Sequence, residues 1–287
     1  MGEPIFREYD RKGLDREYDN RAKVADSERH LAWYTSESAA ARAVLPGRLD
    51  VPYGPSTAET LDVFPAVGPE PAPVQVFIHG GYWRALDKSN HSFVAPPLVA
   101  ASVGVAVMNY DLCPAVGIAR IVDECREAVA WLRREGPGHG LSVERLVVSG
   151  HSAGGHLAAM LVATDWHARG HAAGAITGAV AISGVFDLEP LVHVSFNTDL
   201  MLDAGRAYMV SPVHLQPRVP IPMLIAAGAQ ETSEFIRQSW LLWECWPACH
   251  PPTGRAPLFV AERHHFSVLV DLGNPESDLV QHTLAFF

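Results

Sequence analysis

The chain has 287 residues, of which 48% are hydrophobic and 19% charged, with a formal net charge of −10 and a sequence pI near 5.7. This composition excludes a disordered chain, because so apolar a sequence buries enough surface to offset the entropy of ordering. The acidic excess argues against nucleic acid and anionic membranes as partners, since both are bound through Lys and Arg. The length suits one large α/β domain, so we predict a single domain over residues 1–287.

The N-terminal residues show no basic segment followed by an apolar one, so we expect no signal peptide and a cytoplasmic protein. The longest weakly polar stretch, residues 172–186, is shorter than the roughly 20 residues of a membrane helix. The four cysteines are Cys113, Cys125, Cys245 and Cys249. They are too few and too scattered for a disulfide framework. Cys245, Cys249 and His250 lack a second pair of ligands, so we expect buried thiols there, no metal and no other cofactor.

Residues 1–45 differ in composition from the rest and are predicted to form a helical extension. Within it, residues 27–45 have helical periodicity, with Leu31, Tyr34 and Ala41 near one face and a Pro-Gly pair at the end. We expect this extension to pack on the main domain. It either roofs the functional site or only stabilises the body, and the sequence leaves both open.

Beyond residue 48, short apolar runs alternate with longer amphipathic segments. The predicted strands are residues 61–64, 74–78, 103–108, 146–149, 180–183, 223–227 and 258–261. The predicted helices are residues 118–134, 154–164 and 235–246. Strands that alternate with helices indicate a mostly parallel sheet with helices on both faces. The predicted fold class is therefore α/β.

The pentapeptide Gly150-His151-Ser152-Ala153-Gly154 has the G-x-S-x-G pattern of a nucleophilic serine. The serine of this pattern sits on a tight, strained strand-to-helix turn, which needs small residues two positions before and after it. The turn lifts Oγ above the sheet and points the free N–H groups of the helix at the reacting centre. A predicted strand precedes the motif and a predicted helix follows it. Ser152 is therefore predicted to be the nucleophile of a serine hydrolase with the α/β-hydrolase fold.

A second motif, His79-Gly80-Gly81-Tyr82-Trp83, follows the predicted strand 74–78. Acyl transfer needs N–H donors aimed at the oxyanion of the tetrahedral intermediate. A Gly-Gly pair lets the backbone turn its amides into the site without interference from Cβ atoms. We predict that the N–H groups of Gly80, Gly81 and Ala153 form the oxyanion hole. The alternative is an ordinary turn that ends the strand.

The order of catalytic residues in this fold is serine, then acid, then histidine. After the last predicted strand, His264 and His265 are adjacent, and only one of them can face Ser152. We favour His265. After the strand before it, Glu231 lies closer to the strand end than Glu234, which suits the first turn of a helix. The predicted triad is Ser152, Glu231 and His265.

These motifs together resemble the kynurenine formamidase (arylformamidase) branch of the hormone-sensitive-lipase-like α/β hydrolases. The other segments that look like this family are Tyr18–Arg21, Ser183–Leu188, Ser211–Pro212, Glu234–Ser239 and His265–Ser267, so the resemblance covers nearly the whole chain. It implies that Ser152 and His265 belong to the triad and that Gly80 and Gly81 belong to the oxyanion hole. The family's acid is commonly Asp. The matching residue here is Glu231, whose extra methylene moves either the loop or the carboxylate.

The resemblance implies hydrolysis of a small aryl-containing acyl substrate, an N-formyl arylamine such as N-formylkynurenine. A carboxylesterase acting on small esters is the alternative, because both reactions use the same triad and oxyanion hole. A non-catalytic ligand-binding α/β hydrolase is a more remote alternative. Tyr82 and Trp83 suit a flat aromatic group of the substrate, although Trp83 also suits core packing. The expected partner is a small molecule, and a homodimer is left open.

Overall fold

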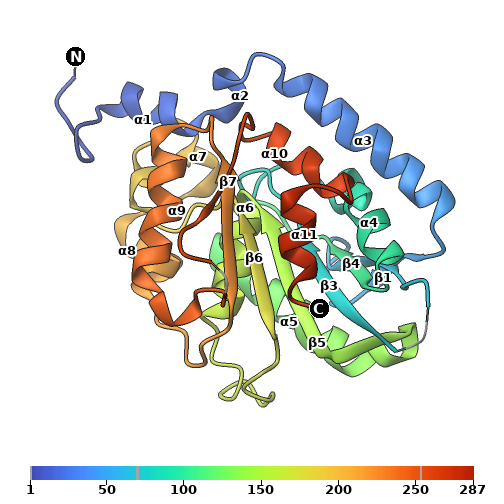
Figure 1. Ribbon diagram of the computed structural model, residues 1–287. Helices are drawn as coiled ribbons and strands as arrows, with labels where there is room; N and C mark the ends of the chain where they lie inside the picture. Colours follow the sequence, from blue (N-terminus) through green and yellow to red (C-terminus); the bar gives the residue numbers. More distant parts are fainter. Residues whose placement is uncertain (1, 69–70, 253) are drawn as a thin grey trace.

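The computed structural model describes residues 2–68, 71–252 and 254–287. Its centre is an eight-stranded sheet in the order β1-β2-β4-β3-β5-β6-β7-β8 (Figure 1). The strands are β1 (Arg48–Pro52), β2 (Thr60–Phe64), β3 (Ala72–Ile78), β4 (Gly104–Met108), β5 (Leu141–His151), β6 (Gly178–Ile182), β7 (Met223–Gly228) and β8 (Leu258–Val260). Strand β2 pairs antiparallel with β1 and β4, and the other neighbours pair parallel. The mostly parallel sheet predicted from the sequence is confirmed.

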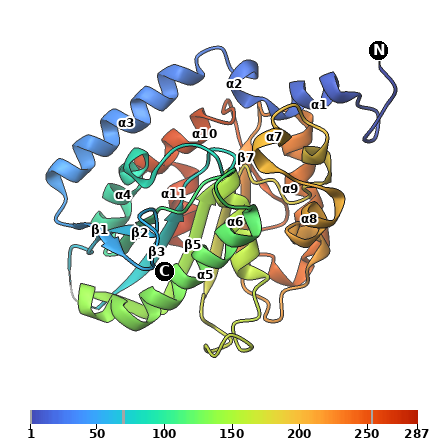
Figure 2. The same cartoon turned by 180° about the vertical axis from the view of Figure 1, so that it is seen from behind.

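Helices cover both faces of this sheet (Figure 2). They are α1 (Arg11–Tyr18), α2 (Asn20–Lys23), α3 (Ser27–Val44), α4 (Ala95–Ala100), α5 (Ile118–Glu135), α6 (Ala153–Val162), α7 (Asn197–Leu200), α8 (Ala204–Met209), α9 (Ser233–Cys245), α10 (Ser267–Val270) and α11 (Asp278–Leu284). Among the described residues, no helix combines the length and the apolar character that crossing a membrane requires.

The core is divided by the sheet into two hydrophobic clusters. Val74, Val76 and Ile78 of β3 pack in the cluster that includes α5, α6 and α9, whereas Phe77 packs in the cluster of α3, α4, α10 and α11. This alternation follows from the strand period of two, which sends successive side chains to opposite faces. Because both faces are covered, the central strands are apolar runs, and this is why the sequence revealed them.

The structure differs from the sequence prediction mainly at the sheet edge and in short helices. Strand β1 was not predicted, because most of its residues are exposed and it has no apolar alternation. Helix α4 has the sequence APPLVA, in which Pro occupies the first turn, the one place where a helix tolerates it. Strand β5 begins at Leu141, five residues before the predicted start at residue 146. Cys245, which was expected to be a buried thiol, is only half-buried.

The N-terminal extension forms helices α1, α2 and α3, which cross the top of the molecule in Figure 1. In α3, Tyr34 and Ala41 lie about two turns apart on the same face and are buried against the body. The last residues of the extension lead directly into β1. The extension is therefore packed on the same sheet-centred body that carries the candidate site.

Candidate active site

Ser152 lies on the turn between β5 and α6, with φ 56° and ψ −118°. A positive φ at a residue with a side chain is strained, so the surroundings must enforce it. A Cβ atom on Gly150 would lie 2.2 Å from the carbonyl oxygen of Gly154, and one on Gly154 would lie 2.0 Å from that of Ile78. Both glycines of the motif are thus required by close backbone packing around the serine.

Ser152, His265 and Glu231 form a continuous hydrogen-bonded chain. His265 Nε2 lies 3.1 Å from Ser152 Oγ, and His265 Nδ1 lies 2.7 Å from Glu231 Oε2. The other carboxylate oxygen of Glu231 accepts from Ser183 Oγ at 2.5 Å and from the Gly228 N–H at 2.8 Å. With Nδ1–H bound to the carboxylate, Nε2 is free to accept the serine proton. The structure therefore brings the three predicted residues together from three separate strand ends.

The two alternative residues lie elsewhere. Glu234 is in the first turn of α9, where it accepts from Tyr18 Oη at 2.8 Å and from Arg237 Nε at 2.9 Å. His264 turns away from the serine, and its Nε2 lies 3.8 Å from Asp26 Oδ1. Neither side chain hydrogen-bonds to the serine. The extra methylene of Glu231 is accommodated because a serine hydroxyl and a backbone N–H hold its second oxygen.

The histidine within the serine motif, His151, supports the loop that carries His265. Its Nε2 donates to the backbone carbonyl of His265 at 2.8 Å. Burial, together with the nearby His265, holds the pKa of His151 well below its usual value, so the ring is neutral. A neutral ring donates from one nitrogen only, which fixes its tautomer. Sequence analysis did not assign this role, and its position one residue before the serine was the available signal.

The loop after β3 packs beside the serine. Gly81 lines the cavity with φ +104°, and a Cβ there would lie 2.1 Å from a backbone oxygen, so glycine is required. Gly80 packs against Ser152, with 3.1 Å between its Cβ position and the serine Cβ. In the described part of the chain, the N–H groups of Gly80, Gly81 and Ala153 have no hydrogen-bond partner. All three are therefore available as donors beside the serine.

The two aromatic residues of that loop have different environments. Tyr82 lines the cavity, and its hydroxyl donates to the carbonyl of Tyr18 at 2.6 Å. Trp83 is 0% exposed and packs in the core, perpendicular to the ring of His156 at 4.9 Å. The prediction that Trp83 contacts the substrate is therefore wrong. Left-handed backbone angles at both residues, φ 50° and 55°, turn the indole beneath the loop.

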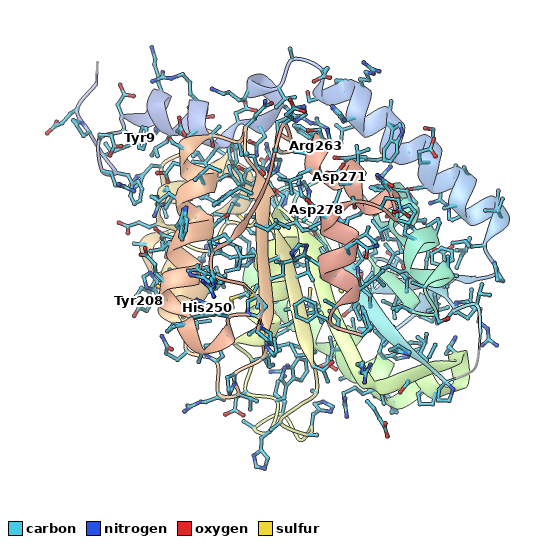
Figure 3. The ribbon with its side chains drawn as sticks, in the orientation of Figure 1. Tyr9, Tyr208, His250, Arg263, Asp271 and Asp278 are labelled. Carbon is cyan, nitrogen blue, oxygen red and sulfur yellow. The ribbon has the colours of Figure 1, made fainter. Side chains whose placement is uncertain are left out.

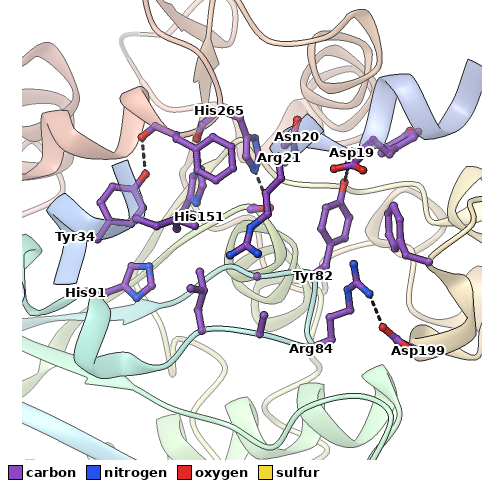
Figure 4. Close-up of a pocket in the computed structure, with 18 residues that line it drawn as sticks. Asp19, Asn20, Arg21, Tyr34, Tyr82, Arg84, His91, His151, Asp199 and His265 are labelled. Carbon is purple, nitrogen blue, oxygen red and sulfur yellow. Dashed lines mark hydrogen bonds and ion pairs between the residues drawn. The ribbon is translucent and has the colours of Figure 1, made fainter. Parts of the chain in front are cut away.

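An active-site cavity of about 370 Å³ opens above Ser152 and His265 (Figure 4). Residues Tyr18–Arg21, Leu31 and Tyr34 of the N-terminal extension line it, so the extension roofs the site. The remaining walls combine apolar side chains such as Leu86, Phe196 and Phe266 with the charged residues Arg84 and Asp199 and with three histidines. His91 also lines the cavity, and burial lowers its pKa to about 3, so it is neutral near pH 7.

A buried hydrogen-bond network fixes the roof to α9. Tyr18 is completely buried, and Gln238 Nε2 donates to its hydroxyl at 3.0 Å. Gln238 Oε1 accepts from the backbone N–H groups of Phe186 and Asp187, both at 2.8 Å. Burial, reinforced by the carboxylate of Glu234, raises the pKa of the Tyr18 hydroxyl well above its usual value, so it remains a donor. Tyr18, Glu234 and Gln238 lie in the segments Tyr18–Arg21 and Glu234–Ser239, whose resemblance to the family named above was the sequence signal for their importance.

The histidine loop is held from both ends. Tyr34 of α3 donates from its hydroxyl to the carbonyl of Phe266. Arg263, two residues before His265, donates from Nε to both carboxylate oxygens of Asp271 at 3.0 Å (Figure 3). The backbone N–H of Gln230, next to Glu231 in sequence, donates to the Arg263 carbonyl at 2.8 Å. The acid and base loops are thus joined directly to each other.

Asp26, His30 and His264 are the described residues whose ligand atoms, all within 4.8 Å of one another, come close enough to hold a metal. However, His264 Nδ1 accepts from the backbone N–H of Ser267 at 3.2 Å. Its Nε2 therefore carries the ring proton and points toward Asp26 as a donor, 3.8 Å away. The cluster is better suited to linking α3 to the histidine loop than to binding a cation.

The fold and this site define an α/β hydrolase. Residues 61–244 match the BD-FAE family model. The chain is 30% identical to kynurenine formamidase of Danio rerio over 85% of its own length and 83% of that protein. It is 33% identical to kynurenine formamidase of Salmo salar over 69% of the chain and 68% of that protein. The protein belongs to the kynurenine formamidase family of α/β hydrolases.

A solved structure agrees with this assignment. The crystal structure of a presumed thioesterase from Silicibacter sp. TM1040 superimposes with a TM-score of 0.83 at 33% identity. The match covers 93% of this chain and 97% of that one, so the two proteins share nearly their whole fold. The predicted family resemblance is confirmed.

Proposed function

We propose that the protein hydrolyses a small N-formyl arylamine such as N-formylkynurenine, through an acyl-enzyme on Ser152. The observation that carries this proposal is the Ser152–His265–Glu231 chain, with separations of 3.1 and 2.7 Å, at the base of the cavity. The names of the relatives supply the substrate class. The cavity, about 370 Å³, is of the size that small ligands occupy.

In the first half of the reaction, His265 Nε2 takes the proton of Ser152 as Oγ attacks the formyl carbon. The carbonyl electron pair moves to oxygen, and the N–H groups of Gly80, Gly81 and Ala153 stabilise the oxyanion. The tetrahedral intermediate collapses when His265 returns the proton to the departing arylamine nitrogen. The products of this half are the free amine and a formyl ester on the serine.

In the second half, water replaces the amine. His265 takes a proton from the water, whose oxygen attacks the formyl ester, and the same oxyanion forms again. Collapse releases formic acid, which loses its proton to solvent to give formate, as His265 returns its proton to Ser152 Oγ. Glu231 holds the Nδ1–H of His265 throughout, which orients the ring and stabilises its cation.

Hydrolysis of small esters is the second candidate function. It is supported by the Silicibacter structure, which is 33% identical to this chain and is described as that of a presumed thioesterase. An ester needs no protonation of a basic nitrogen leaving group, so the same residues serve with less demand on His265 as an acid. The two reactions differ only in the leaving atom. Measured activity on matched formamide and ester substrates, rather than the identity of the catalytic residues, distinguishes the two reactions.

The deciding measurement is kcat/KM for N-formylkynurenine and for a short-chain aryl ester, with Ser152→Ala as control. We expect the formamide to be preferred by more than tenfold, about 1.4 kcal/mol of transition-state stabilisation. Preference for the ester, or no turnover of the formamide, would assign the protein to the esterases. Full activity in Ser152→Ala would remove the serine mechanism altogether.

Other expectations from the sequence stay predictions. One is a cytoplasmic location. Another is the absence of nucleic-acid and membrane partners, for which the acidic charge is the argument. A homodimer is also left open. Size-exclusion chromatography with light scattering measures the last of these directly.

A further inference from the structure

Arg21 is a cation in the roof of the active-site cavity with little to bind. Its only ion pair in the described part of the chain is with Glu28, at 3.9 Å, and both side chains are more than half exposed. Such a contact contributes little to stability. No hydrogen bond of the guanidinium is found to any described residue, although Arg21 lines the cavity. In Figure 4 its side chain extends from α2 into the cavity between Tyr82 and His151.

Its neighbour Asn20 presents a second donor without a partner. Asn20 is 5% exposed and lines the same cavity, yet its amide nitrogen has no hydrogen-bond partner among the described residues. A buried polar group left unsatisfied is costly, typically about 1–3 kcal/mol. Two adjacent donors that face a cavity and lack acceptors indicate that a ligand supplies the acceptor.

The other arginine of the cavity, Arg84, is already engaged. It forms an ion pair with Asp199, and its guanidinium lies 5.0 Å from the ring centre of Phe196. Figure 4 shows this pair on the far side of Tyr82 from the histidines. Arg21 is therefore the cavity cation whose charge is least neutralised by the protein, in a chain whose net charge is −10.

The backbone that carries these two donors is anchored by hydrogen bonds on its N-terminal side. The Asp19 side chain begins α2 by accepting from the Ala22 N–H at 3.1 Å. Immediately before it, the Tyr18 carbonyl accepts from Tyr82 Oη at 2.6 Å, and the Tyr18 hydroxyl is tied to Glu234. A donor pair on an anchored turn binds its ligand with less loss of conformational entropy.

We propose that Asn20 and Arg21 form a carboxylate-binding subsite in the roof, which makes the preferred substrates aryl formamides that carry a carboxylate. The identity of the cleaved bond in this statement rests on the proposed function. The guanidinium fork binds the two carboxylate oxygens, and the Asn20 amide donates to one of them. The anion is thereby held at the roof while the formyl group reaches Ser152.

The test compares Arg21→Gln, Arg21→Lys and a matched control, Lys23→Gln, with the unmodified protein. Lys23 is exposed on the same short helix and does not line the cavity. Three substrates are used. The first is N-formylkynurenine, and the second is its analogue without the amino group, which is 4-(2-formamidophenyl)-4-oxobutanoate. The third is the neutral N-(2-acetylphenyl)formamide. The last keeps the ring, ketone and formamide but has no carboxylate.

We expect Arg21→Gln to raise KM about tenfold for the two carboxylated substrates, with kcat and the neutral substrate nearly unchanged. Arg21→Lys keeps the charge and should recover part of this loss. Lys23→Gln should match the unmodified protein. Equal loss on all three substrates, or no loss on any, overturns the proposed subsite.

Failure of the proposed function gives a different result. In that case the unmodified protein hydrolyses aryl esters and leaves all three formamides intact. The same variants are then compared on 4-acetoxybenzoate and phenyl acetate. A loss in Arg21→Gln confined to the carboxylated ester supports the subsite, and equal behaviour on both esters overturns it.

Discussion

The floor and the roof of the cavity are built by different means. The floor consists of Ser152, Glu231 and His265, which occupy turns at the ends of strands where backbone contacts leave little freedom. The roof consists of α1–α3, which pack on the body through a few side chains such as Leu14 and Tyr34 and through side-chain hydrogen bonds such as that from Tyr18 to Glu234. The reacting groups thus depend on the fold itself, whereas the groups that meet the rest of the substrate depend on a few replaceable side chains. Substitutions in the floor should abolish the reaction, and those in the roof should alter which substrates are accepted.

The largest effect is expected from Glu231→Gln in the floor. The change removes the charge that stabilises the His265 cation, so kcat should fall roughly 10³–10⁴-fold, about 4–5.5 kcal/mol. Thermal unfolding should change little, because the substitution conserves size. Glu244→Gln, on the exposed side of α9, is the matched control. A loss of less than tenfold in kcat would show that Glu231 does not act through the histidine.

Gly154→Ala tests the backbone packing of the floor. The new methyl group would lie 2.0 Å from the Ile78 carbonyl oxygen, and neither helix nor strand can move away cheaply. The free energy of unfolding, measured in urea, should fall by about 3 kcal/mol. Gly138→Ala is the control, since nothing lies within 4 Å of its Cβ position. Equal stability of the two variants would contradict the close contact.

Acid should lower the stability of the whole fold through two buried histidines near the floor, His91 and His156. Burial lowers the pKa of His91 to about 3 and that of His156 to about 4, whereas both titrate near 6.5 when unfolded. Below pH 6.5 the unfolded chain therefore binds protons that the folded chain does not, and stability falls as the pH falls. For these two residues the loss should be about 2 kcal/mol between pH 6.5 and 5.5. Urea unfolding at both pH values measures it, and an unchanged free energy of unfolding would argue against buried neutral histidines.

The smallest effect is expected from Tyr18→Phe in the roof. It removes the hydroxyl that donates to Glu234 and accepts from Gln238, so unfolding should become easier by about 1–2 kcal/mol. Because the turn that carries Arg21 is loosened, KM should rise while kcat stays nearly constant. Tyr208→Phe is the control, since Tyr208 is 60% exposed. A fall in kcat with constant KM would mean that Tyr18 supports the floor instead.

The floor was largely predictable from the sequence because its constraints are local. The G-x-S-x-G motif is short, and the strands that lead to Ser152 and Glu231 are buried on both faces and read as apolar runs. The choice between adjacent candidates was harder. His264 and His265 differ only in the direction of their side chains, which the chain order of the triad does not reveal.

The roof was predictable only as a helical segment. Tyr18 and Glu234 are 216 positions apart, and helix α1 has the charged sequence RKGLDREY, which does not identify the face it buries. Trp83 shows the opposite error. Its place beside two glycines of the oxyanion loop suggested contact with substrate, but a backbone turn with φ 55° sends it into the core.

The hydrogen bond between Tyr34 and Phe266 has a consequence for the order of events on the ribosome. These residues are 232 positions apart, so the first helices are made long before the loop that they contact exists. Because synthesis proceeds from the N-terminus at about 5–20 residues per second, α3 must wait at least ten seconds for its partner. During that interval α3 can already pack on residues 88–94, where Arg42 donates to Ser92 Oγ at 2.9 Å. The contact between the roof and the histidine loop is therefore completed last, after the sheet and the serine turn have been synthesised.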